Sequence, residues 1–155
     1  MRGCQLHDAV PFTGPPACSR GWTFGGGHLA LWLASQKTIP LKGVAALAAV
    51  SDLRRAHKLN LSNGAVEAFL GGGPEEFNDR YAATSPLDLL PLQVPQVLLH
   101  GTGDEIVPFE LSRRFADASA NARLVALPGA GHFELIDPRS QEWPTVLRNI
   151  LSLIV

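Results

Sequence analysis

The sequence predicts an α/β fold, in which a parallel sheet is flanked by helices. Residues 44–50 form a short apolar run without polar alternation, which is typical of a strand covered by helices on both faces, and a second apolar run within residues 96–100 is flanked by Pro95 and Gly101. Segments with helical periodicity stand between and around these runs, so strands and helices alternate along the chain. At 155 residues, a single domain is expected.

The elements are expected in the following order. Leu29, Trp32 and Leu33 share one helical face, which predicts a helix over residues 27–35. Strands are predicted at 44–50, 96–100 and 123–127. Further helices are predicted over residues 62–70, from Pro74 onward because proline suits a first helical turn, over 112–120 and over 141–155.

The first 25 residues differ from the rest of the chain. Prolines, glycines and the only two cysteines, Cys4 and Cys18, interrupt every candidate helix or strand. The sequence therefore predicts an irregular segment over residues 1–25 and an α/β domain over residues 26–155.

Composition restricts the partners. Thirteen Lys and Arg residues against fourteen Asp and Glu residues give a net charge of −1, which disfavours nucleic acid and membrane partners. No signal segment and no apolar run of about twenty residues is present, so a cytoplasmic location is expected. No repeated ligand spacing indicates a metal, and no phosphate-binding motif indicates a nucleotide, so no cofactor is expected.

Two residues lie just after the carboxyl ends of predicted strands, where open α/β sheets place their catalytic and binding residues. Asp104 follows the strand at 96–100 after Gly101 and Gly103, and His132 follows the strand at 123–127. An acid followed by a histidine is the chain order of a hydrolase triad. Glu105 is interpreted as a solvated neighbour of Asp104.

These loops resemble those of α/β-hydrolases, especially the esterase and prolyl-oligopeptidase-like branch. The resemblance runs from about Gly26 to the end of the chain. It is carried by His100-Gly101-Thr102-Gly103-Asp104, by Gly129-Ala130-Gly131-His132-Phe133, and by Gly26-Gly27-His28-Leu29-Ala30, which is similar to the helix after the nucleophile.

The resemblance implies serine-type hydrolysis of an ester or peptide bond, with Asp104 as the triad acid and His132 as the base. The remaining histidines are interpreted as ordinary residues: His7 in a loop, His28 at a helix start, His57 in a polar helix and His100 in a turn. The alternative is a non-catalytic hydrolase-like fragment or protein-interaction module.

The nucleophile is missing from the sequence as written. Residues 21–25 fit G-x-T-x-G with Thr23 at the centre, but the spacing to Gly26 puts Phe24 where the family has serine. Thr23 is a poor candidate because its branched side chain enters a strained turn.

The genetic code suggests an explanation. The codons for residues 21–26, shifted by one base, can encode alanine, glycine, histidine, serine and alanine, with the serine at position 24. The same shift upstream permits an apolar strand, as the elbow requires. We therefore hypothesise that residues 1–25 are an out-of-frame reading of a hydrolase strand and elbow.

The expected fold is accordingly a partial α/β-hydrolase fold, the carboxyl-terminal half, without its N-terminal strands. An oxyanion donor from the missing part would also be lost, which costs about 100- to 1,000-fold in turnover. The expected partners are a small ester or peptide substrate and, through an exposed sheet edge at residues 44–50, a second copy of the chain.

Overall fold

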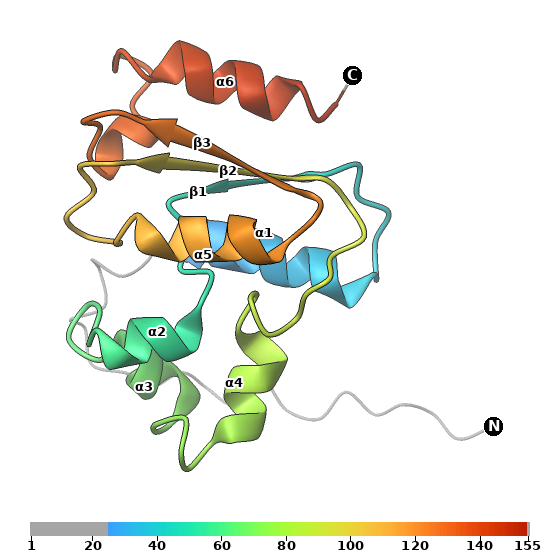
Figure 1. The fold of residues 1–155 in the computed structure, drawn as a ribbon, viewed down its shortest axis with the longest axis vertical. Coiled ribbons are helices and arrows are strands. Elements are labelled where there is room, and N and C mark those ends of the chain that lie inside the picture. The colour runs from blue at the N-terminus through green and yellow to red at the C-terminus, as the bar shows by residue number, and fades with distance from the viewer. Residues whose placement is uncertain (1–24, 155) are drawn as a thin grey trace, which may run out of the picture.

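Three parallel strands form the centre of the structure, with helices on both faces (Figure 1). The computed structural model describes residues 25–154, so Thr23, Phe24 and the hypothesised out-of-frame segment up to residue 24 lie outside the described residues. The elements are α1 (Gly25–Gln36), β1 (Val44–Leu47), α2 (Leu53–Lys58), α3 (Ala65–Leu70), α4 (Asn78–Thr84), β2 (Gln96–Gly101), α5 (Glu110–Ala118), β3 (Ala122–Leu127), the 3-10 turn η2 (Phe133–Leu135) and α6 (Trp143–Leu151).

The strand order is β1-β2-β3, and all pairs are parallel. Leu47 at the end of β1 lies opposite Leu99 of β2, and Gly101 at the end of β2 lies opposite Leu127 of β3, so the three strands end near one another. Every residue of β2 is buried, which fits the apolar run Val97-Leu98-Leu99 at its centre. The predicted α/β class is therefore confirmed, and the shared carboxyl edge places the loops after β2 and β3 side by side.

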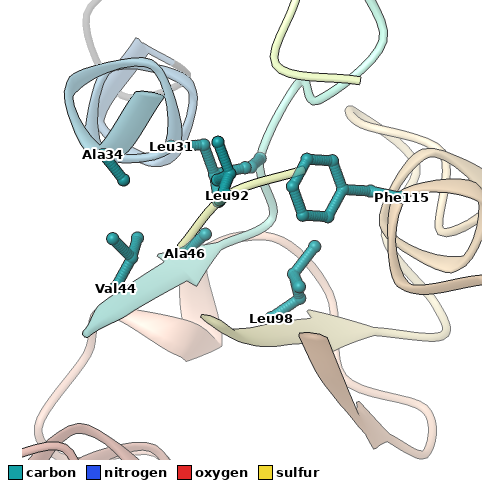
Figure 2. Close-up of a cluster of buried hydrophobic side chains, with 8 residues drawn as sticks. Leu31, Ala34, Val44, Ala46, Leu92, Leu98 and Phe115 are labelled. Atoms are coloured by element: carbon teal, nitrogen blue, oxygen red, sulfur yellow. The ribbon is translucent and has the colours of Figure 1, made fainter. Parts of the chain in front are cut away.

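Helices α1 and α5 cover one face of the sheet (Figure 1). The close-up in Figure 2 shows the side chains that join them to it, with Leu31 of α1 and Phe115 of α5 pointing at the strands. Both side chains are completely buried. The cluster consists of Leu31, Ala34, Val44, Ala46, Ala49, Leu92, Leu98 and Phe115.

Helix α6 covers the opposite face of the sheet (Figure 1). Val97 and Leu99 of β2 point to this side because successive strand residues alternate between faces. They pack with Val146 of α6 and with Leu135, which follows the histidine loop. The loop after β3 is thus anchored directly in the core.

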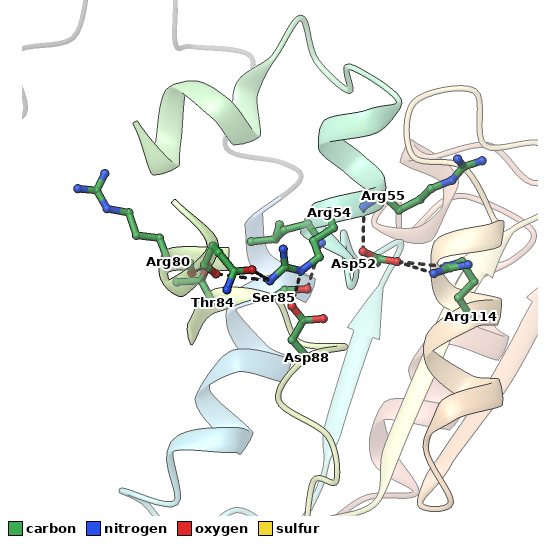
Figure 3. A network of polar contacts seen from close by, with 10 residues as sticks. Asp52, Arg54, Arg55, Arg80, Thr84, Ser85, Asp88 and Arg114 are labelled. Carbon is green, nitrogen blue, oxygen red and sulfur yellow. Dashed lines mark hydrogen bonds and ion pairs between the residues drawn. The ribbon is translucent and has the colours of Figure 1, made fainter. Parts of the chain in front are cut away.

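Helices α2, α3 and α4 form a separate layer below α1 and α5 (Figure 1). Figure 3 shows the polar contacts that hold this layer. Asp52 caps α2 by accepting from the Arg55 amide at 2.9 Å, and its other carboxylate oxygen lies 3.1 Å from Arg114 of α5. Arg54 binds Asp88 at 2.8 Å. The layer is therefore joined to the sheet domain through Arg114 of α5.

Several predicted bounds are wrong for local reasons. The strand expected to reach residue 50 ends at Leu47, because Ala48 has a φ of +42° that no strand residue adopts. The helix expected from residue 62 begins at Ala65, since Ser62, Asn63 and Gly64 also have positive φ.

The helix expected at Pro74 begins instead at Asn78, because residues 74–76 form a turn closed by the Phe77 amide on the Gly73 carbonyl. The final helix spans Trp143–Leu151 rather than residues 141–155. Among the described residues, no helix combines the length and the apolar character that crossing a membrane requires.

Candidate active site

Asp104 lies in the turn that follows β2, with its carboxylate completely buried. Its Oδ1 accepts the backbone N–H groups of Ile106 at 2.9 Å and Val107 at 2.8 Å. Two backbone donors on one oxygen orient the carboxylate, because rotating it would break both bonds. Oδ2 is thereby directed away from the turn and toward the loop after β3.

His132 lies in that loop and meets Oδ2 directly. Its Nδ1 is 2.6 Å from Asp104 Oδ2, and its side chain is only 5% exposed. Because an ionised carboxylate can only accept, Nδ1 carries the proton and the lone pair of the neutral ring lies on Nε2. The two residues that the resemblance pairs as acid and base are therefore joined by a hydrogen bond.

The loops are fixed to each other by backbone contacts as well. The Thr102 amide donates to the Leu127 carbonyl at 3.0 Å, and the Gly103 amide to the Ala130 carbonyl at 2.9 Å. In return, the Gly129 amide donates to Thr102 Oγ1 at 2.9 Å. The spacing of Asp104 and His132 is thus set by the sheet and its turns.

A second histidine contacts the same carboxylate, and the sequence interpretation missed it. His100 is not in a turn but inside β2, fully buried, with its Nε2 3.4 Å from Asp104 Oδ2 and 2.9 Å from the Val107 carbonyl oxygen. Its Nδ1 is 2.7 Å from Ser112 Oγ on α5. Burial lowers the pKa of His100, so the ring is neutral.

A pocket of about 200 Å³ lies beside His132, between the start of α1 and the end of β1. Gly27 permits this arrangement, since a Cβ there would lie 2.8 Å from the Ala49 Cβ. The lining residues are Gly26, Gly27, Ala45, Leu47, Ala48, His132, Leu135 and Ile136. The start of α1 therefore meets the histidine loop at the edge where the nucleophile is expected.

The other candidate residues do not join this pair. Glu105 is exposed, as expected. His28 is buried and its Nε2 donates to the Thr84 carbonyl at 2.9 Å, which joins α1 to α4. His57 lies 3.4 Å from Glu67 in the helical layer. Thr23, Phe24 and His7 lie outside the described residues.

No group of three or more His, Cys, Asp or Glu residues in the described part of the chain could hold a metal ion. The arrangement that the site does contain is a buried acid joined to a histidine at the carboxyl edge of a parallel sheet. That arrangement, on a three-stranded parallel sheet with helices on both faces, defines a partial α/β-hydrolase fold.

Comparison with known proteins specifies the family. The model of the prolyl oligopeptidase family matches residues 16–152, which is most of the chain. This protein belongs to that family.

Individual relatives are hydrolases. A bifunctional esterase/perhydrolase of Acinetobacter calcoaceticus is 36% identical over 88 residues, which are 54% of this chain and 30% of the relative. A crystal structure of a puromycin hydrolase mutant superimposes with a TM-score of 0.65 at 28% identity, over 83% of this chain and 20% of the other.

Est1E from Butyrivibrio proteoclasticus shares the fold, with a TM-score of 0.62 at 20% identity over 84% of this chain and 59% of its own. The chain therefore spans less than a third of the length of the curated esterase and about a fifth of the puromycin hydrolase chain.

Proposed function

We propose that this chain carries the acid and the base of a serine-type hydrolase that acts on ester or peptide bonds. The observation that carries the proposal is the 2.6 Å contact between His132 Nδ1 and Asp104 Oδ2, buried at the carboxyl edge of the sheet in a member of a peptidase family. The substrate class follows from the relatives, which include an esterase and a puromycin hydrolase.

In this proposal His132 acts first as a general base. Nε2 takes the proton of the nucleophile hydroxyl as its oxygen attacks the substrate carbonyl, and the ring becomes an imidazolium. Asp104 holds the Nδ1 proton and stabilises that positive charge. His132 then gives the proton to the leaving group, and a water molecule repeats the sequence to release the acid product.

The hydroxyl is the part that the written sequence does not supply. Position 24, immediately before α1, is where the family has its serine, and Phe24 has no group able to attack a carbonyl. We propose that a one-base shift of the reading frame over residues 1–25 explains the missing serine. Resequencing the coding DNA tests the proposal, which fails if no single-base change restores a serine in frame.

Labelling by a fluorophosphonate probe tests the catalytic proposal, because the probe reacts only with an activated nucleophile. The set consists of the chain as written, the chain with its reading frame restored so that a serine stands at position 24, and that restored chain with His132→Ala. We expect the frame-restored chain to label and its His132→Ala variant to lose the label. Thr23→Ala in the chain as written shows whether any background label comes from Thr23.

A specific observation favours a second candidate, a non-catalytic hydrolase-like fragment. No serine lies between Arg20 and Leu33 in the written sequence, so the usual nucleophile is absent from the expected position. If the frame-restored chain stays unlabelled while the Asp104–His132 contact is intact, or labels equally without His132, the catalytic proposal is wrong and the non-catalytic one stands.

A further inference from the structure

The turn that carries Asp104 is held from two sides. On one side Asp104 Oδ1 accepts the Val107 amide at 2.8 Å. On the other side the Val107 carbonyl oxygen, in a residue only 1% exposed, lies 2.9 Å from His100 Nε2. Val107 is therefore clamped between the acid and the buried histidine.

The proton positions on His100 follow from its neighbours. A carbonyl oxygen only accepts, so Nε2 carries the proton and donates it to Val107, with Asp104 Oδ2 3.4 Å away on the same side of the ring. Nδ1 of the neutral ring is then an acceptor, and Ser112 Oγ donates to it at 2.7 Å. Ser112 is itself completely buried, so water cannot replace this donor.

We propose that His100, oriented by Ser112, is a positioning residue that keeps the Asp104 carboxylate directed at His132. Without its N–H, the buried Val107 carbonyl has no donor, and the turn must move to satisfy it. That movement carries Asp104 with it, because Val107 and Asp104 are joined through Oδ1. The proposal deepens the proposed function and rests on it, since positioning matters to catalysis only if His132 is the base.

Two substitutions at His100 separate the donor from the rest of the ring. His100→Gln can place an amide donor near the position of Nε2, whereas His100→Asn reaches only the position of Nδ1 and contacts Ser112. The readout is the His132 Nδ1 proton in a proton NMR spectrum, which a short bond to a carboxylate moves far downfield and protects from exchange with water.

We expect this proton in the unmodified chain and in His100→Gln. In His100→Asn its exchange with water should be about tenfold faster, the factor expected for one lost hydrogen bond. Ser119→Ala is the matched control: Ser119, a buried serine at the other end of α5, donates to Gln96 Oε1 at 2.7 Å, far from the acid turn. It should lower the melting temperature without changing the exchange rate.

If His100→Asn does not fold, Ser112→Ala carries the test, since it removes the group that orients the ring. Its exchange should be faster than that of Ser119→Ala. The proposal is wrong if a folded His100→Asn or Ser112→Ala variant exchanges as slowly as Ser119→Ala, or if the unmodified chain lacks the downfield proton. Failure of the fluorophosphonate labelling with these exchange rates as expected would overturn the proposed function alone.

Discussion

Gly101 and Ala130 approach each other so closely that no side chain fits between them. A Cβ built on Gly101 would lie 2.1 Å from the Ala130 carbonyl oxygen, and both partners are held by the backbone contacts that join the acid and histidine loops. The glycine of the His-Gly pair is thus required for the spacing of the two loops.

Gly101→Ala should accordingly destabilise the protein by about 3 kcal/mol or more, because the clash is with backbone rather than with a movable side chain. Urea unfolding measures this. Gly26→Ala is the control: a Cβ there meets nothing within 4 Å, and alanine favours a helix by up to about 1 kcal/mol. Equal effects of the two substitutions would contradict the proposed tight contact.

Stability should fall below pH 6.5 in part through His28. Burial lowers the pKa of His28 from its usual 6.5, so between the lower folded value and 6.5 the unfolded chain binds a proton that the native state does not. Stability is therefore full above pH 6.5 and is lost as the pH falls toward the folded value. His28→Gln keeps an amide donor for Thr84 and should flatten this dependence by up to about 1.4 kcal/mol per pH unit.

Trp32→Phe is the control for that measurement. It removes the neighbouring 3.1 Å bond from Trp32 Nε1 to the Ala83 carbonyl, also between α1 and α4, without removing a titrating group. The free energy of unfolding, measured from pH 5 to 8, should be lower for Trp32→Phe at every pH, while its dependence on pH should not change. If the pH dependence of the free energy of unfolding changed equally in both variants, the titration of His28 would be ruled out as its cause.

Asp52 should matter as a helix cap more than as an ion-pair partner. Asp52→Asn retains an oxygen for the Arg55 amide and loses only the pair with Arg114, whose side chain is 51% exposed, so the loss should stay below about 1 kcal/mol. Asp52→Ala also loses the cap and should cost about 1–2 kcal/mol. Chemical unfolding of the two variants compares these contributions. Equal losses would mean that the cap contributes nothing.

The edge of β1 carries the prediction of self-association. Among residues 25–154, β1 pairs only with β2; on that side the Val44 amide donates to the carbonyl of Pro95, just before β2, and the Ala48 amide donates to the carbonyl of Leu99. By alternation, the Ala45 amide points away from β2. We propose that a second copy pairs there. Ala45→Pro removes this outward donor and should lower the mass seen by light scattering, whereas Ala45→Ser should not. A cooperative monomer of 16.6 kDa in the unmodified chain would contradict this proposal.

The sequence predicted the sheet well because burial on both faces leaves a plain apolar signature, as in β2. Asp104 and His132 could also be found, since each follows a strand within a glycine-containing turn. The carboxyl end of β1 and the start of α4 were missed, because a positive φ at Ala48 and the turn at Pro74 depend on how the chain packs locally.

His100 could not have been assigned from the sequence. Its partners, Ser112 and the Val107 carbonyl, stand 12 and 7 residues away and meet the ring only once α5 packs against β2. A histidine at the end of an apolar run looks like the first polar residue of a turn. Only the packed structure shows that it is completely enclosed.

Asp104 and His132 are 28 residues apart, and every contact described between their loops is made within the β2-α5-β3 unit. Closing so short a segment costs little chain entropy, so the pair can assemble with its own strand-helix-strand unit. Under the proposed function, this unit would be the receiving half of a split enzyme. A nucleophile supplied on a separate polypeptide would need to bring its hydroxyl and strand, but not the acid–base pair.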